Sequence, residues 1–415
     1  MRTRNRLTLA AALLLAASIS IHAQVPDQYK GVFRLYDFSA PRKDAPAPKG
    51  YKAFSISHYG RHGARYLSRE GYYSAVVDLF TSQAAAGNLT AFGQEYWTRM
   101  QGVLPSFLGR AGDLTDLGAE QHRTLGARMY RQYPSIFRHN PEITATTSTT
   151  QRCAMSMVNF CEGMAAQNPR LDIYKTIDSR DMAFCNPYAF LEKDKADYRD
   201  FNRAYFGRKV DVRPIYTRLF RDPDAAIAAA DSFDFVRNLC KFACHMQCTE
   251  FPDVNFDDAF TPEEIAAIYD VENQRFYLAK GYGMVSSPTR MYNFVKPLVD
   301  KVIADAERDT ASERPTVRLR FGHDGIIQAF LAYLHIDRWG DRPESPEDVI
   351  NIWSNSAIPM ACNMRFVFYR DRKGDVIFKF QLNESDVQLP LKAVEGPFYR
   401  WADFVEYAGK LALAQ

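Results

Sequence analysis

The sequence lacks a strong charge of either sign, internal repeats and low-complexity linkers. Its 52 Lys and Arg residues against 49 Asp and Glu residues leave a formal net charge of only +3. This balance gives no reason to expect nucleic acid or an anionic membrane surface as a partner. Apolar residues make up 47% of the 415 residues and charged residues 24%, which is typical of a globular chain with one large domain or two ordinary ones.

Long apolar runs are missing everywhere except at the N-terminus. Three arginines (Arg2, Arg4 and Arg6) precede an apolar run over residues 7–19, and Ile21-His22-Ala23 is a plausible cleavage site. The run is shorter than the roughly 20 residues of a spanning helix, so residues 1–23 are predicted to be a secretory signal and not a membrane anchor. Removing them takes away three arginines and no acid, which leaves a mature chain of zero net charge, exported to a periplasm or secreted.

Cysteine is sparse, with seven residues, all after the predicted signal. An oxidising compartment permits disulfides, but an odd number leaves at least one thiol unpaired, and spacing does not fix the pairing. Cys240, Cys244, His245 and Cys248 also have a spacing that could suggest a metal site. Ligands at i, i+4 and i+8 equally form a buried helical stripe, and structural zinc sites normally use separated pairs, so burial or disulfide bonding is favoured over metal.

Three segments share one pattern: a strand followed at once by charged residues. Residues 51–57 alternate as a strand that we expect to stop at His58-Tyr59-Gly60, before Arg61, His62 and Arg65. Residues 142–147 form a second strand, with Ser148 or Thr149 as the expected helix cap and Arg152 in the first helical turn. Residues 317–321 form a third strand, and His323 and Asp324 open the helix that follows.

The order of these segments predicts an α/β fold with a mainly parallel sheet and helices on both faces. Ligands bind at the carboxyl ends of strands in such sheets, so the three junctions would together make one cationic pocket. Residues 24–165 and 291–415 are assigned to this core. Residues 166–290 are rich in Phe, Tyr, Arg and Asp and have few strand patterns, which predicts an inserted, mostly helical cap. Residues 364–384 read as two strands joined by a turn over residues 370–374.

The junction residues can be considered as reagents. Arginines at 61, 65 and 152 suit phosphate oxygens, and a neutral His62 is a competent nucleophile toward phosphorus. His323 can donate a hydrogen bond to the same phosphate, and Asp324 can protonate a departing alkoxide. Gly60 and Gly63 are expected to let an anion approach the backbone closely. This set predicts a phosphomonoester hydrolase that works by positioning and electrostatics and needs neither metal nor other cofactor.

"RHGAR" at residues 61–65 and "GHD" at 322–324 resemble the histidine acid phosphatase branch of the histidine phosphatase superfamily. "LTDLGAEQHRTLGARM" and "STTQR" are similar to the intervening motifs of that branch, and the resemblance runs from about residue 50 to the end. "HYGRHGARY" and the C-terminal "IPMACNMRFVFYR" and "FQLNESDVQLPL" look most like multiple inositol polyphosphate phosphatases and phytases.

The resemblance implies a role for each matching residue and a phosphoglycerate mutase-like fold. His62 would form a covalent phosphohistidine, and Asp324 would be the proton donor. The transferred phosphate would be bound by Arg61, Arg65, Arg152 and His323. Two positions depart from the family pattern: Leu67 stands where proline is frequent, and His323-Asp324-Gly325 stands where the inositol polyphosphate phosphatases commonly have His-Ala-Glu. The second departure weakens the substrate assignment but not the reaction type.

Other polar residues have less specific patterns. His58 is expected to support the site from behind, and His122, His139 and His335 are expected to be structural. Basic residues of the predicted cap could meet outer phosphates, but the acids among them make a solvated helix face equally plausible; they are Lys193, Lys195, Arg199, Arg203, Arg208 and Lys209.

We therefore expect an exported acid phosphatase whose only partner is a small phosphomonoester, with inositol phosphates such as phytate as the leading substrates. The alternatives within the same superfamily are a general acid phosphatase for sugar phosphates or nucleotides, and a phosphoryl-transfer mutase. The same residue types would also suit a metallohydrolase with His62, His323 and Asp324 as ligands, or a phosphate-ester-binding protein without turnover. No membrane anchor, nucleic acid or obligatory protein partner is expected.

Overall fold

The computed structural model describes residues 25–187, 196–285 and 294–413. The predicted signal, Lys193 and Lys195 lie outside these ranges. Within them, no helix is both long and apolar enough to cross a membrane.

A nine-stranded sheet forms the centre of the molecule, with β3-β2-β4-β1-β5-β6-β9-β8 as its order and β7 paired to β6. The first four of these strands run parallel: β1 (Lys52–Arg61), β2 (Glu142–Thr147), β3 (Ile173–Thr176) and β4 (Thr316–Gly322). The others pair antiparallel: β5 (Asn363–Arg370), β6 (Val376–Leu382), β7 (Ser385–Asp386), β8 (Ala393–Glu395) and β9 (Phe398–Arg400).

The expectation of a mainly parallel sheet is therefore wrong, because the sheet is mixed. Short connections join the strands in the C-terminal half of the sheet. One of them is the turn between β5 and β6, which passes through Gly374 at φ +91°. A tight turn can only join antiparallel strands, whereas parallel strands need a long crossover. The two strands predicted over residues 364–384 are present as β5 and β6.

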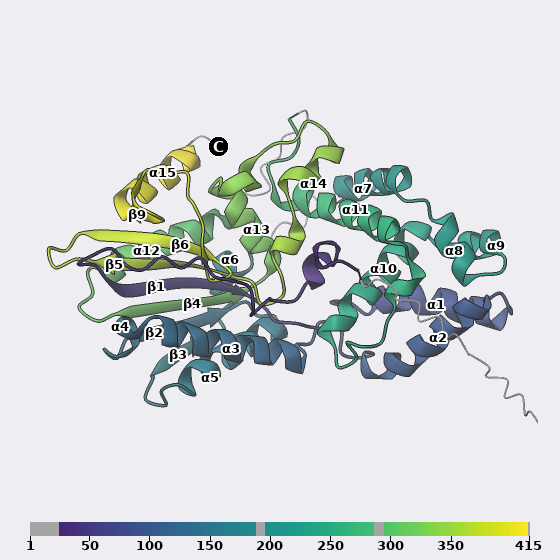
Figure 1. Ribbon diagram of the computed structural model, residues 1–415, viewed down its shortest axis with the longest axis horizontal. Coiled ribbons are helices and arrows are strands. Elements are labelled where there is room, and N and C mark those ends of the chain that lie inside the picture. The colour runs from purple at the N-terminus through teal and green to yellow at the C-terminus, as the bar shows by residue number, and fades with distance from the viewer. Residues whose placement is uncertain (1–24, 188–195, 286–293, 414–415) are drawn as a thin grey trace, which may run out of the picture.

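Helices cover both faces of the sheet, as predicted (Figure 1). One face carries α3 (Asp116–Gln132), α4 (Pro134–Phe137) and α5 (Gln151–Ala165). The other carries α6 (Met182–Cys185), α12 (Lys296–Thr310), α13 (Asp324–Tyr333) and α15 (Trp401–Leu413). Strand residues alternate between the two apolar layers: Ile56 packs with Phe160 on the α5 side, and Tyr59 packs on the α13 side.

A second group of helices lies beyond the carboxyl ends of the parallel strands, on the right in Figure 1. Its members are α1 (Gly71–Ala85), α2 (Ala91–Val103), α7 (Ala196–Lys209), α8 (Arg213–Leu219), α9 (Pro223–Ala229), α10 (Ser232–His245) and α11 (Pro262–Lys280). They share one apolar cluster in which Tyr73, Val76 and Phe80 of α1 meet Phe235 and Leu239 of α10. The short α14 (Val349–Ile352) contacts α11.

These contacts do not follow the division expected at residues 166 and 290. The helices α1 and α2 were expected in the core, yet their apolar faces pack with α10 and α8. Conversely, β3 and α6 lie after residue 166 but belong to the sheet and its cover, since β3 pairs with β2. Four residues are too few to show a strand pattern in the sequence. A separate inserted domain therefore stays a prediction.

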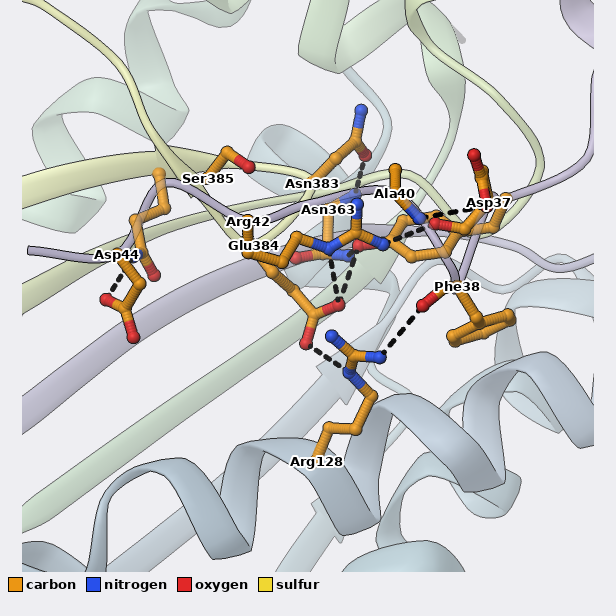
Figure 2. A network of polar contacts seen from close by, with 12 residues as sticks. Asp37, Phe38, Ala40, Arg42, Asp44, Arg128, Asn363, Asn383, Glu384 and Ser385 are labelled. Atoms are coloured by element: carbon orange, nitrogen blue, oxygen red, sulfur yellow. Dashed lines mark hydrogen bonds and ion pairs between the residues drawn. The ribbon is translucent and has the colours of Figure 1, made fainter.

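The N-terminal segment links the two parts of the molecule. Residues 27–33 form two 3-10 turns beside α11, and the chain then crosses the end of the sheet. Figure 2 shows how the crossing segment is held: the buried carboxylate of Glu384 lies 3.0 Å from Nε of Arg128 on α3 and 3.6 Å from Nε of Arg42. Tyr36 donates a hydrogen bond to the same carboxylate at 3.0 Å. This network anchors the chain shortly after residues 29–33, which line the cavity described below.

Candidate active site

The three strand–loop junctions meet at one edge of the sheet. In the order β2-β4-β1, Thr147 pairs with Phe321, and Gly322 pairs with Arg61, so the strands end side by side. The backbone N–H of His62 donates to the carbonyl of Gly322 at 3.0 Å, which joins two of the junctions directly. The convergence predicted from the sequence is thus present.

Local structure differs from expectation in two details. Strand β1 continues through Arg61 instead of stopping at His58, because Cys362 and the β5 strand supply hydrogen-bond partners to its last residues. The N-cap position of α5 is Thr150 and not Ser148 or Thr149. Its side chain makes no capping hydrogen bond. Arg152 lies in the first turn of α5, as predicted.

A cavity of about 430 Å³ opens at this edge. Five of the six residues selected from the sequence line it: His62, Arg65, Arg152, His323 and Asp324. The sixth, Arg61, is fully buried behind them, with its Nε 4.0 Å from Oδ1 of Asp324. All six predicted residues are therefore brought together.

The imidazole of His62 is held in one tautomer. Its Nδ1 lies 2.9 Å from the carbonyl oxygen of Gly63, and because a carbonyl only accepts, Nδ1 carries the hydrogen. Nε2 then carries the lone pair, and His62 is one of the residues that line the cavity. Burial, and after it the charges of Arg152, Arg61 and Arg65, lower the pKa of His62 well below its usual value. Burial and these charges therefore favour the neutral form of the ring.

The guanidinium groups of the site retain unused hydrogen-bond donors. Nη1 of Arg61 donates to the carbonyl of Ile358 at 2.8 Å, while its Nε and Nη2 have no hydrogen-bond acceptor among the described residues. Arg65 donates from Nη1 to the carbonyl of Tyr66 at 2.7 Å and stacks on Phe33. Buried donors without acceptors are costly, so an anion that supplies oxygens here would be bound strongly.

His323 and Asp324 lie at the start of α13, one as its N-cap and the other as its first residue. Nε2 of His323 lies 3.4 Å from the hydroxyl oxygens of both Ser148 and Thr150, at the β2 junction. Burial, followed by the charge of Arg152, lowers the pKa of His323 to about 3. Burial alone would raise the pKa of Asp324, but Arg61 and the ammonium group of Lys280 bring it down to about 2.

The two glycines of the first motif are required by close packing within the protein. A Cβ on Gly63 would lie 2.4 Å from the carbonyl oxygen of Gly118 on α3, and one on Gly60 would lie 2.8 Å from the ring of His58. A Cβ on Gly118 would in turn lie 2.2 Å from the carbonyl oxygen of Ala64. The end of β1 and the loop after it therefore pack closely on their neighbours, and the close approach of an anion stays a prediction.

The sequence analysis missed most of the positive charge around the cavity. Six further cations line it: Lys30, Arg69, Arg237, Lys241, Arg275 and Lys280. Glu272 and Asp324 are the acids among the lining residues. Arg237 and Lys241 lie one helical turn apart on α10, and Glu272 lies on α11. The sequence alone does not show which face of either helix meets the cavity.

The cations proposed from the sequence lie elsewhere. Arg199 pairs with Asp234, and Arg203 pairs with Asp231, both on the surface of the helical group. Arg208 and Lys209 are also outside the cavity lining. The acids beside these cations neutralise them, as the mixed charge pattern of the segment had suggested as one of two possibilities.

None of the remaining candidate histidines lines the cavity. His58 and His122 are buried on the α5 side of the sheet, against Phe160 and Phe321. His335 contacts the ring of Tyr282, and His139 is exposed. All seven cysteines are free, and among the described residues no group of three or more His, Cys, Asp or Glu side chains is placed to hold a metal ion.

An imidazole, converging arginines and a carboxyl group meet at the ends of parallel strands, and comparison with known proteins identifies the family. The model of the histidine phosphatase superfamily (branch 2) matches residues 60–383. The chain belongs to this family, and it is a phosphoric monoester hydrolase.

The chain is similar to several phytases and to a multiple inositol polyphosphate phosphatase. The chain is 24% identical to phytase A of Emericella nidulans over 413 residues, which cover 89% of this chain and 84% of that one. Its fold is similar to that of the Bifidobacterium longum multiple inositol polyphosphate phosphatase in complex with inositol hexasulfate, with a TM-score of 0.77 and 19% identity over 91% of this chain and 97% of that one. The phytase from D. castellii has a TM-score of 0.68 and 15% identity over 93% and 85% of the two chains.

Proposed function

We propose that the protein is an exported histidine acid phosphatase that hydrolyses inositol phosphates through a phosphohistidine on His62. The observation that carries this proposal is the tautomer of His62, which leaves Nε2 with the lone pair in a residue that lines a cavity together with Arg65, Arg152 and His323. A neutral nucleophile surrounded by cations suits attack on an anionic phosphorus centre. Export rests on the predicted signal at residues 1–23.

The reaction would proceed in two balanced steps. Nε2 of His62 forms a bond to phosphorus as the ester oxygen leaves and takes the proton of Asp324. Water then attacks the phosphohistidine and gives a proton to the Asp324 carboxylate, which releases inorganic phosphate and regenerates both groups. Arg61, Arg65, Arg152 and His323 would bind the phosphoryl oxygens in both steps.

Asp324 must hold a proton for the first step, although Arg61 and Lys280 lower its pKa to about 2 against the effect of burial. The arginines that depress this pKa also bind the substrate phosphate. A bound phosphate brings negative charge beside the carboxyl group and offsets those cations, which raises the pKa of Asp324. Substrate binding thereby supplies the acid form, and we expect catalysis to be fastest in acidic solution.

The remaining charge of the cavity favours substrates with several phosphates. Carboxylate oxygens of Glu272 lie 3.0 Å from Nη2 of Arg275 and 3.8 Å from Nζ of Lys241, and also contact Arg237. These cations line the cavity on α10 and α11. The residues proposed to bind the transferred phosphate lie instead at the strand–loop junctions at the edge of the sheet. A single phosphate has no need for this second group. The alternative is a general acid phosphatase for sugar phosphates or nucleotides.

Rapid-quench trapping tests the mechanism. With substrate labelled in its phosphate, the wild-type protein should give an acid-labile phosphoprotein, and His62→Ala should lose both the label and the turnover. His139→Ala is the matched control, because its side chain is exposed and remote from the cavity. Wild-type turnover in His62→Ala would refute the proposal. Phosphate release measured on inositol hexakisphosphate, sugar phosphates, nucleotides and an aryl phosphate separates the substrate classes and, by net release, excludes a mutase.

A further inference from the structure

The cavity contains two thiols to which the phosphatase mechanism gives no role. Arg237, Cys240, Lys241 and Cys244 lie on one face of α10, and all four line the cavity. The sequence analysis expected these cysteines in a buried stripe or a disulfide. Both side chains are nearly closed to bulk solvent, with exposed fractions of 7% and 6%, yet they border the open volume of the cavity. A small molecule that enters the cavity can therefore reach them.

His245 and Cys248, whose spacing with the two thiols could suggest a metal site, make their contacts outside the cavity. Nδ1 of His245 hydrogen-bonds the carbonyl of Phe242 at 2.6 Å, and its ring packs among Tyr73 and Phe107. Sγ of Cys248 donates to the carbonyl of Phe33 at 3.4 Å. Neither residue lines the cavity. Two sulfurs remain, which is too few for a closed tetrahedral metal site.

The distance between the two sulfurs suits one bridging atom. Sγ of Cys240 lies 4.0 Å from Sγ of Cys244, so the thiols are not bonded to each other. Bonds of about 2.3 Å from one atom to two sulfurs, the length seen in zinc–thiolate sites, place the sulfurs roughly 3.3–3.8 Å apart when the angle at that atom is about 90–109°. A small rotation of either side chain therefore brings both sulfurs onto a shared atom, and the backbone of α10 need not move.

The positive charge of the cavity favours a neutral thiol-binding reagent over a metal cation. The lining cations outnumber the acids, so a soft metal cation entering the cavity would be repelled. The environment also raises the pKa of Cys244, through the thiol of Cys240 and through burial, and so opposes the thiolate that a metal ion requires. A neutral reagent that condenses with protonated thiols avoids both obstacles.

We propose that Cys240 and Cys244 form a dithiol site for neutral trivalent arsenicals on the wall of the active-site cavity. Two arsenic–oxygen bonds of an R–As(OH)₂ group break and two arsenic–sulfur bonds form. The two thiol hydrogens leave with the hydroxyl groups as two molecules of water. Arsenic stays trivalent and sulfur keeps its oxidation state, so no oxidant is involved. The bound group lies beside Arg237 and Lys241 and blocks the cavity to a phosphate ester.

Phenylarsine oxide and the reduced full-length protein provide the test. Intact mass should show one phenylarsenic group bound per chain with two hydrogens lost, and phosphatase activity should fall together with adduct formation. A small dithiol such as 2,3-dimercaptopropanol should remove the adduct and restore activity, whereas a monothiol should not. Inorganic phosphate should slow adduct formation, because it occupies the same cavity.

Serine variants assign the site. Cys240→Ser and Cys244→Ser should each lose the stable adduct, and their activity should be the same with and without the reagent. Cys161→Ser is the matched control, since Cys161 is buried on α5 in another apolar cluster, and it should react like the wild type. An adduct that persists in both cavity variants, or one that leaves wild-type activity intact, overturns the proposal.

Blocking of the substrate rests on the proposed phosphatase function, but adduct formation does not. If the wild-type protein hydrolysed none of the phosphate esters, the proposed function would fail while the mass measurement still tested the dithiol site. If the protein hydrolysed them and formed no adduct at Cys240 and Cys244, the dithiol proposal would fail alone.

Discussion

At the scale of the residue, His62 and Asp324 lie among the same arginines, and these act on the two groups in opposite ways. Burial and the positive charges together favour the neutral imidazole, which the proposed nucleophile requires, and the positive charges also favour the ionised carboxyl group, which the proposed acid must reverse. A bound phosphate relieves the second effect because it adds negative charge at the centre of the cluster. The acid is therefore expected to form only when substrate is present.

Asp324→Asn tests this role. The amide keeps the shape of the side chain but cannot give a proton to a leaving alkoxide. Esters with poor leaving groups should slow by about 10²–10⁴-fold, while aryl phosphates, whose phenolate leaves without a proton, should change far less. Steady-state rates plotted against the leaving-group pKa should therefore steepen in the variant. Equal slowing of both ester types would remove Asp324 from the acid role.

At the scale of the element, the position of the nucleophile loop depends on its packing against α3. Gly118 is the third residue of this helix, and its N–H is capped by the hydroxyl of Thr115 at 3.3 Å. The backbone of Ala64 lies against it, where a side chain would need to be. The family-like "LTDLG" motif thus has a structural purpose, which is to let the helix support "RHGAR".

Gly118→Ala should separate α3 from the loop. The added methyl group would overlap backbone atoms, which cannot rotate away, so we expect a loss of about 1–3 kcal/mol in the free energy of unfolding and a fall in kcat/KM. Gly102→Ala in α2 is the control, since nothing lies within 4 Å of its new methyl group. That change should instead stabilise the protein by about 0.5–1 kcal/mol. Urea denaturation and kinetics of both variants check the pair, and indistinguishable variants would contradict the packing argument.

Helices α10 and α11 provide the wall opposite the sheet, and Lys241 tests their part in substrate choice. Lys241→Gln removes one cation but leaves Glu272 paired with Arg237 and Arg275. A lost charge-assisted hydrogen bond of about 1.5–3 kcal/mol predicts a rise of at least about tenfold in KM for inositol hexakisphosphate. KM for an aryl phosphate should change little. Arg213→Gln, an exposed change on α8, should alter neither value, and equal effects on both substrates would rule out a second phosphate position.

The sequence was informative about strands and junctions because each depends on local patterns. Alternation located β1, β2 and β4, and the charged residues after them identified the transferred-phosphate site. The direction of β5 relative to β1 was not predictable, since these two strands pair across about 300 residues of chain. Lys241 and Arg275 were missed for a similar reason: their helices are visible in the sequence, but the face that meets the cavity is set by tertiary packing.

At the scale of the whole molecule, buried histidines link stability to pH. Burial lowers the pKa of His122 and His323 to about 3 and that of His245 to about 4, and it also lowers those of His58 and His62. An unfolded histidine takes up its proton near pH 6.5, whereas these remain neutral in the folded state. Below pH 6.5 the unfolded chain therefore binds more protons, so stability falls as the pH falls.

We expect the free energy of unfolding to decrease by about 2 kcal/mol between pH 7 and pH 5 for each of His122, His245 and His323. Carboxyl groups with lowered pKa values act mainly below about pH 5, so they contribute little to this interval. Urea denaturation at the two pH values measures the difference. His122→Phe, which fits a ring between Phe160 and Phe321, should reduce it, and the exposed His139→Phe should not. Identical urea midpoints at pH 5 and pH 7 would contradict this account.

The position of β1 in the sheet has a consequence for how the chain folds. This strand comes first in the sequence, yet its two neighbours are β4 and β5, which begin at residues 316 and 363. The N-terminal segment before it is likewise anchored by Lys379 and Glu384. On a ribosome the central strand therefore has no partner until most of the chain has been made. Closing loops of that length makes folding slow, and it leaves an apolar strand with open edges exposed to other chains until the last hundred residues arrive.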